Sequence, residues 1–194
     1  ELLRCSVAFA GNDHRLGAQE APPAIISIFL GTELEGIIDA IVAENDYTAP
    51  EHKSLRIGVD VLPAIPQDTT DRNRTSPLAF TGNKFEFRMP GSSQSIAGPV
   101  TILNAIMADE LDDFYEKLKD AGDFTTALHK LIRDTFCAHG RIIFNGNGYE
   151  EAWVKEAEKR GLANLHNTAE ALPAYILPKN IEMLTRQGVY SREE

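Results

Sequence analysis

The hydrophobic pattern of the chain changes at Pro99. Before this residue, short apolar runs alternate with turns that contain Gly and Pro, which predicts strands. One stretch near residues 34–42 differs, because its apolar residues recur at the spacing of a helix face. The predicted strands are Ala24–Leu30, Leu55–Val61, Leu78–Phe80 and Asn83–Met89.

After Pro99 the apolar residues follow long helical stripes. One predicted helix runs from Pro99 toward Gly122, and the next begins at the capping residue Asp123 and ends at Gly140. The other predicted elements are a short strand at Arg141–Phe144, a turn at Asn145–Gly148, a helix at Tyr149–Arg160 and helices near Thr168–Leu172 and Ile181–Gln187. The whole pattern predicts an α+β fold, strand-rich over residues 1–95 and mostly helical over residues 96–194.

A row of charged residues is predicted on one face of the strand that contains TGNKFEFRM. Because side chains alternate along a strand, Lys84, Glu86 and Arg88 would share one face, with neighbours about 7 Å apart, opposite an aromatic face. A solvated charge ladder is the simpler interpretation of such a row. A carboxylate between two cations could also serve a metal and an anionic substrate.

Two further segments bring arginines near this strand in the sequence. The segment GNDHRLGAQEAPP contains Arg15 and Glu20, and the segment DRNR ends in Arg74. The planar guanidinium donates two parallel hydrogen bonds, which suits carboxylates and phosphates. Each arginine could instead form a salt bridge with a neighbouring acidic residue, for example Arg15 with Asp13.

Composition restricts the class of protein. The 194 residues are 43% hydrophobic and 25% charged, which is typical of a folded protein, and the net charge of −10 argues against a nucleic-acid partner. The longest apolar run, PPAIISIFLG, is too short to span a bilayer, so we expect no membrane partner and a cytoplasmic location. Cys5 and Cys137 belong to no metal-binding motif and are predicted to be reduced packing residues.

Neither end of the sequence reads as a natural boundary of a fold. Residues 1–10 suggest an element already under way, and the last four residues have the spacing of a capping box with no helix after it. We therefore expect residues 1–194 to be a fragment of one catalytic domain, truncated at both ends.

Three ordered segments resemble glutamine synthetase, and more narrowly its long type III branch. They are GNDHRLGAQEAPPAIIS, DTTDRNRTSPLAFTGNKFEFRMPGSSQSIAGP and RIIFNGNGY. The resemblance implies the antiparallel sheet of a glutamine synthetase/guanido kinase-like catalytic domain, of which this chain would be the C-terminal part. It also implies synthesis of L-glutamine from L-glutamate, ATP and ammonia through a γ-glutamyl phosphate, with Mg²⁺ or Mn²⁺, in homo-oligomers of stacked rings.

The resemblance also implies roles for individual residues. Arg15 corresponds to the arginine that holds the glutamate carboxylate, and Glu20 to the flap glutamate that helps to deprotonate ammonium. Arg74 would stabilise the transferring phosphoryl group. Glu86 corresponds to a metal ligand, and Arg88 to an arginine that contacts glutamate or phosphate.

The chain departs from the family pattern at two positions. Lys84 stands where many relatives carry a nucleotide-contacting arginine, so the charge is kept and the fork is lost. The segment after RNR ends in Phe80, where shorter relatives carry another arginine.

One carboxylate cannot organise a cluster of metal ions. The family's other ligands belong to sequence upstream of Glu1, so we expect the isolated fragment to be inactive. Two alternatives remain open. One is a related γ-glutamyl ligase that acts on amines. The other is a structural or assembly portion, whose acidic helical stretch Asp109–Asp123 and helix Tyr149–Gly161 could be either subunit contacts or solvated surfaces.

Overall fold

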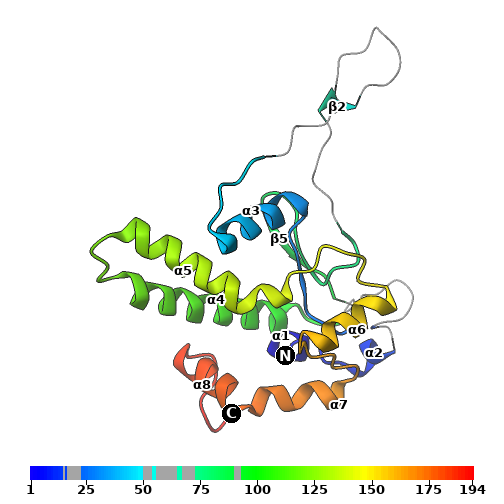
Figure 1. Ribbon diagram of the computed structural model, residues 1–194. Coiled ribbons are helices and arrows are strands. Elements are labelled where there is room, and N and C mark those ends of the chain that lie inside the picture. The colour runs from blue at the N-terminus through cyan, green and yellow to red at the C-terminus, as the bar shows by residue number, and fades with distance from the viewer. Residues whose placement is uncertain (15, 17–22, 50–53, 56–64, 67–72, 90–92) are drawn as a thin grey trace.

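The computed structural model describes residues 1–14, 16, 23–49, 54–55, 65–66, 73–89 and 93–194 (Figure 1). In chain order its elements are α1 (Leu2–Cys5), α2 (Ala10–Asp13), β1 (Ile28–Phe29), α3 (Thr32–Ala43), β2 (Ser54–Leu55), β3 (Ile65–Pro66), β4 (Leu78–Phe80), β5 (Phe85–Phe87), α4 (Ala97–Leu118), α5 (Phe124–His139), η1 (Gly140–Ile142), α6 (Glu151–Lys159), α7 (Thr168–Ala171), η2 (Leu172–Ile176) and α8 (Pro178–Arg186). The predicted α+β class is confirmed.

The larger sheet has the strand order β1-β4-β5. β5 pairs antiparallel with β4 through a tight connection, in which the Thr81 N–H donates to the Lys84 carbonyl at 2.9 Å. β1 pairs parallel with β4, so the prediction of an antiparallel sheet is wrong for this pair. A parallel pair requires a long crossover, and the segment between β1 and β4, which includes α3, is long enough to supply one.

Several predicted strands are shorter in the structure. Ala24–Leu30 reduces to β1, and Asn83–Met89 reduces to β5. Of Leu55–Val61, only Leu55 falls in a described strand, and residues 56–61 lie outside the described residues.

The strand predicted at Arg141–Phe144 is largely wrong. Gly140 keeps a right-handed conformation, with φ −53°, so the chain continues from α5 into the 3₁₀ turn η1. Only Ile143 then joins the sheet, through a parallel bridge to Ile28.

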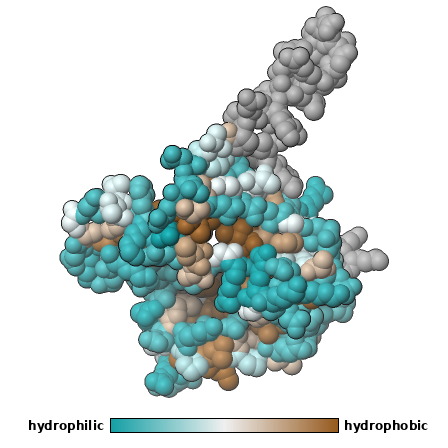
Figure 2. All heavy atoms as spheres, viewed as in Figure 1, coloured by the Kyte–Doolittle hydropathy of each residue, from teal (hydrophilic) through white to brown (hydrophobic). Residues whose placement is uncertain are grey.

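The predicted helices of the second half are confirmed within a few residues. α4 carries Pro99 in its first turn, where the missing N–H costs no intrahelical bond. α5 begins after Asp123, whose side chain accepts from the Thr126 N–H at 3.2 Å. α4 and α5 lie side by side as a hairpin (Figure 1). On the face of the molecule that Figure 2 shows, hydrophilic residues cover most of the described surface.

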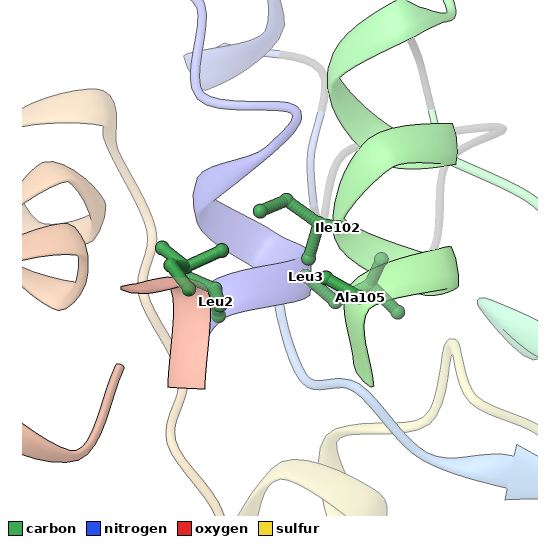
Figure 3. Packing of buried hydrophobic residues seen from close by; sticks show 5 residues of the cluster. Leu2, Leu3, Ile102 and Ala105 are labelled. Atoms are coloured by element: carbon green, nitrogen blue, oxygen red, sulfur yellow. The ribbon is translucent and has the colours of Figure 1, made fainter. Parts of the chain in front are cut away.

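Two apolar clusters fix these elements against one another. The first joins α1, α4 and α8 through Leu2, Leu3, Ile102, Ala105 and Leu184 (Figure 3). The second joins the segment before β1 to α6 through Ile25, Trp153 and Ala157. Within it, the rings of Phe144 and Trp153 stack with centroids 3.7 Å apart.

One prediction about packing residues needs correction. Cys5 is buried as predicted, but Cys137 is exposed on α5. Phe85 is 56% exposed, because it lies in the edge strand β5 and only Phe87 packs against the first cluster. Among the described helices, none is both long and apolar enough to cross a membrane.

Candidate functional site

The predicted charged row on β5 is present. The Glu86 carboxylate lies between its two cationic neighbours: its Oε2 is 2.8 Å from Arg88 Nη2, and its Oε1 is 3.6 Å from Lys84 Nζ. Arg88 Nε also donates to Oε2 at 3.1 Å. Lys84 is mostly exposed, at 65%, whereas the Glu86 and Arg88 side chains are 35% and 23% exposed.

The two cations keep Glu86 ionised. The hydrogen bond from Arg88 lowers the pKa of this carboxyl below its usual value, and the positive charges of Arg88 and Lys84 add to the effect. Glu86 therefore offers a negative oxygen at neutral pH. Oε2 is occupied by Arg88, so Oε1, which has only long contacts with Lys84 and Thr81, is the oxygen better placed to bind a cation.

Arg88 connects β5 to the turn that carries Arg74. Its Nη1 donates to the Asn73 carbonyl at 2.7 Å, and its main-chain N–H donates to the Pro77 carbonyl at 2.6 Å. Arg74 itself is exposed, and no residue in the described ranges forms a hydrogen bond or ion pair with it. The structure thus brings together three of the six predicted site residues, Lys84, Glu86 and Arg88, and places the backbone of the turn that carries Arg74 beside Arg88.

The turn around Arg74 is held by the residues on both sides of it. Asn73 has a positive φ of 25°, which an asparagine tolerates better than most residues. Its Oδ1 accepts from the Thr75 N–H at 3.0 Å and from the Thr75 hydroxyl at 2.6 Å. We call residues 73–75 the RNR turn, because they begin with the last two residues of the RNR motif.

The RNR turn is bonded to the predicted turn Asn145–Gly148, which we call the NGNG turn. Asn73 Nδ2 donates to the Gly146 carbonyl at 2.9 Å, and the Gly148 N–H donates to the Thr75 hydroxyl at 2.7 Å. Asn145 Oδ1 in turn accepts from the N–H groups of Leu30 and Gly31, at 2.9 and 2.8 Å. The sequence predicts the NGNG turn, but it carries no local signal that this turn binds the RNR turn.

Arg15 and Glu20 lie outside the described residues, so their predicted roles stay predictions. The segment just before them is anchored. Asn12 is buried and donates to the Val7 carbonyl at 3.2 Å, and Asp13 accepts from the Thr168 hydroxyl at 2.9 Å.

The described residues supply little of a metal site. No group of three or more His, Cys, Asp or Glu side chains within them could hold a metal ion. Mg²⁺ prefers six oxygens in an octahedron, of which a protein often provides one or two carboxylates. Glu86 Oε1 fits the role of one such ligand, and the described part of the chain cannot hold the ion alone.

Comparison with known proteins agrees with the motifs. Residues 127–194 match the family model of the glutamine synthetase C-terminal domain. The whole chain is 48% identical over 197 residues to the type-3 glutamine synthetase of Dictyostelium discoideum. It is 44% identical over 201 residues to a glutamine synthetase of Bacteroides fragilis (strain YCH46), and 44% identical over 206 residues to one of Butyrivibrio fibrisolvens.

These matches cover all of the chain, which spans 27–28% of the length of these relatives. The resemblance inferred from the three sequence segments is confirmed: over its whole length the chain is similar to a part of these glutamine synthetases, one of which is a type-3 enzyme.

Proposed function

We propose that this chain is the C-terminal part of an ATP-dependent glutamate–ammonia ligase that makes L-glutamine through a γ-glutamyl phosphate. The observation that carries the proposal is the set of Arg74, Lys84, Glu86 and Arg88, joined by the bonds of Arg88 to Glu86 and to the RNR turn. The chain is also 44–48% identical over its whole length to three glutamine synthetases.

The first chemical step transfers the γ-phosphoryl group of ATP to the side-chain carboxylate of glutamate. Both partners are anionic, so the step needs cations to neutralise the moving charge. Arg74 is exposed on the RNR turn, which hydrogen bonds to the NGNG turn hold in place. It has no hydrogen-bond or ion-pair partner among the described residues, which suits contact with the phosphoryl group. Arg88 is fixed by Glu86 and Asn73 and presents its charge beside the same site.

The roles that we propose for Lys84 and Glu86 follow from their charges. Lys84 is the most exposed member of the row and suits a nucleotide phosphate as a point charge. Glu86 Oε1 would be one ligand of a bound Mg²⁺ or Mn²⁺. When bound, this ion neutralises charge on the phosphates.

In the second step, ammonia attacks the acyl phosphate and displaces phosphate. Attack requires neutral ammonia, so a carboxylate must take a proton from ammonium, and the site must exclude water from the activated carbonyl. We propose that Glu20 accepts the proton from ammonium and that Arg15 binds the glutamate carboxylate. In the full-length protein, Glu20→Ala should reduce glutamine formation far more than ATP binding, and unchanged turnover would exclude this role.

The main test is Arg74→Ala in the full-length protein to which we assign this chain. Removing an arginine that stabilises a transferring phosphoryl group costs on the order of 1,000-fold in turnover. Arg192→Ala is the matched control, because Arg192 is also exposed. Glutamine formation is measured with glutamate, ATP and ammonium, and wild-type turnover of Arg74→Ala would refute the assignment.

A second measurement separates glutamine synthesis from the related ligation of amines. Competition between ammonium and organic amines in the same assay should favour ammonium. The 194-residue chain alone should form no glutamine, because its described residues offer one candidate metal ligand. Glutamine formation by the purified chain would contradict this expectation.

We also propose that the protein assembles as a homo-oligomer. α4 exposes Met107, Leu111 and Tyr115 at four-residue spacing, with 57%, 59% and 64% of each residue accessible. Such an apolar stripe is of the kind that a subunit contact covers. Mass measurement in solution tests this, and a monomer at all protein concentrations would exclude it.

A further inference from the structure

The NGNG turn carries no group that the proposed reaction uses, yet it is bonded to the RNR turn on both sides of Arg74. We propose, on the basis of the role assigned above to Arg74, that the NGNG turn, Asn73 and Thr75 together position Arg74 for the phosphoryl group. None of these residues needs to touch the substrate. They act by fixing the backbone from which the Arg74 side chain extends.

The clamp acts on the two residues adjacent to Arg74. On one side, Asn73 Nδ2 donates to the Gly146 carbonyl at 2.9 Å. On the other side, the Thr75 hydroxyl accepts from the Gly148 N–H at 2.7 Å and donates to Asn73 Oδ1 at 2.6 Å. The Thr75 hydroxyl therefore uses both its proton and a lone pair, and it couples the two halves of the clamp.

The clamp allows no side chain at Gly148. A Cβ built on this residue would lie 2.4 Å from the Thr75 carbonyl oxygen, a distance that real Cβ atoms do not reach. The two turns approach this closely only because position 148 is glycine. If a side chain at position 148 pushed the two turns apart, the hydrogen bond from the Gly148 N–H to the Thr75 hydroxyl would lengthen or break.

The NGNG turn is itself held to the body of the protein. Phe144, just before it, donates from its N–H to the Ile28 carbonyl at 2.9 Å and stacks on the buried Trp153. Asn145 bonds to the end of β1 through two N–H groups. The RNR turn is therefore connected, through the NGNG turn, to the second apolar cluster of Ile25, Trp153 and Ala157.

Preorganisation is what this support can add to phosphoryl transfer. Arginine has a long side chain, and each bond left free to rotate must be ordered when the ligand binds. Fixing the backbone at Arg74 limits the positions that its guanidinium can take. Arg88 depends less on the NGNG turn, because it has its own bonds to Glu86 and to the Pro77 carbonyl.

The test is Thr75→Val in the full-length protein, with Thr75→Ser as the conservative variant. Valine keeps the shape and removes both hydroxyl bonds, whereas serine keeps the hydroxyl. We expect Thr75→Val to lower kcat about 10- to 100-fold, the loss typical of a small displacement of a catalytic group, with KM for glutamate within about threefold of the wild type. Thr75→Ser should retain most of the wild-type kcat.

A control and a double variant separate positioning from general damage. Thr135→Val is the control, because the Thr135 hydroxyl donates to the Leu131 carbonyl at 2.7 Å on α5 and touches neither turn. In the Arg74→Ala background, Thr75→Val should cause no further loss of kcat, because the group that it positions is gone. Additive losses in the double variant would overturn the inference.

A further variant covers the case in which Thr75→Val does not fold. Asn73→Gly accepts the positive φ and removes the three side-chain hydrogen bonds to Gly146 and Thr75, so it should lower kcat in the same way. Wild-type kcat in a folded Thr75→Val or Asn73→Gly protein would overturn the inference and leave the role of Arg74 intact. Wild-type kcat in Arg74→Ala alone would instead refute the proposed function of Arg74, and with it the positioning role.

Discussion

Replacing Asn145 with alanine should destabilise the chain measurably, because Asn145 satisfies two backbone N–H groups. Its Oδ1 accepts from Leu30 and Gly31, both only partly exposed. An N–H left without an acceptor costs about 1–3 kcal/mol, and partial access of water brings each nearer the lower end. The substitution also removes Asn145 Nδ2, which is buried and has no hydrogen-bond partner among the residues that the structure describes, and this offsets part of the loss. The expected net loss is about 1–3 kcal/mol.

Fluorescence gives a direct assay of this loss. The chain has one tryptophan, Trp153, which is 2% exposed and stacks on Phe144, the residue before Asn145. Urea unfolding followed by its emission should therefore report the stability of this cluster. The free energy of unfolding is obtained by linear extrapolation, with an m-value that should not change.

Two variants sharpen the test. Asn145→Asp keeps an accepting oxygen and should lose less stability than Asn145→Ala. Asn104→Ala removes a single exposed bond from Nδ2 to the Val100 carbonyl, and should change the free energy of unfolding by less than about 0.5 kcal/mol. The reasoning fails if Asn145→Ala stays within that same limit, or if the alanine and aspartate variants are equally destabilised.

Three other changes have outcomes that the structure fixes in direction. The hydrogen bonds from Thr126 lower the pKa of Asp123 below 3.8. This cap therefore stabilises the fold above pH 3.8, and the stabilisation is lost as the pH falls through the lowered pKa. The variant Asp123→Asn keeps an accepting oxygen without the charge, so its melting temperature should depend less on acid pH than that of the wild type. Gly148→Ala would place a methyl group 2.4 Å from a backbone oxygen of the RNR turn, so it should lower the melting temperature by several degrees. A thiol reagent should modify the exposed Cys137 rapidly, and Cys5 only on unfolding, because burial shields the Cys5 thiol and raises its pKa; two rapidly reacting thiols in the folded chain would contradict this.

The helices of this chain could be predicted because their signals are local. The spacing of apolar residues along α4 and α5 lies within a few turns, and the cap at Asp123 depends on the next three residues. The strands were predicted less well. β1 has only two residues, because its length depends on the pairing with β4 and on where that partner ends. Such pairing leaves no periodic trace in a short segment.

The candidate site divides in the same way. Alternation along one strand predicts that Lys84, Glu86 and Arg88 share a face, and the structure confirms their contacts. The bonds between the RNR and NGNG turns join residues 73 positions apart. Asparagine in both turns and glycine in the NGNG turn indicate only that the backbone reverses there, so the contact between the two turns is seen only in the structure.

The geometry of Glu86 limits how a metal ion could be accommodated beside Arg88. Both donors from Arg88 converge on Oε2, at 3.1 and 2.8 Å, whereas Oε1 has one longer ion pair with Lys84 and a contact with Thr81 at 3.5 Å. A cation approaching Oε1 would thus displace the weak interaction with Lys84 and leave the Arg88 pair in place. Lys84 would then be free to swing toward an anionic ligand, because its side chain is 65% exposed. Lys84 can move in this way, since it is not held by a bidentate pair.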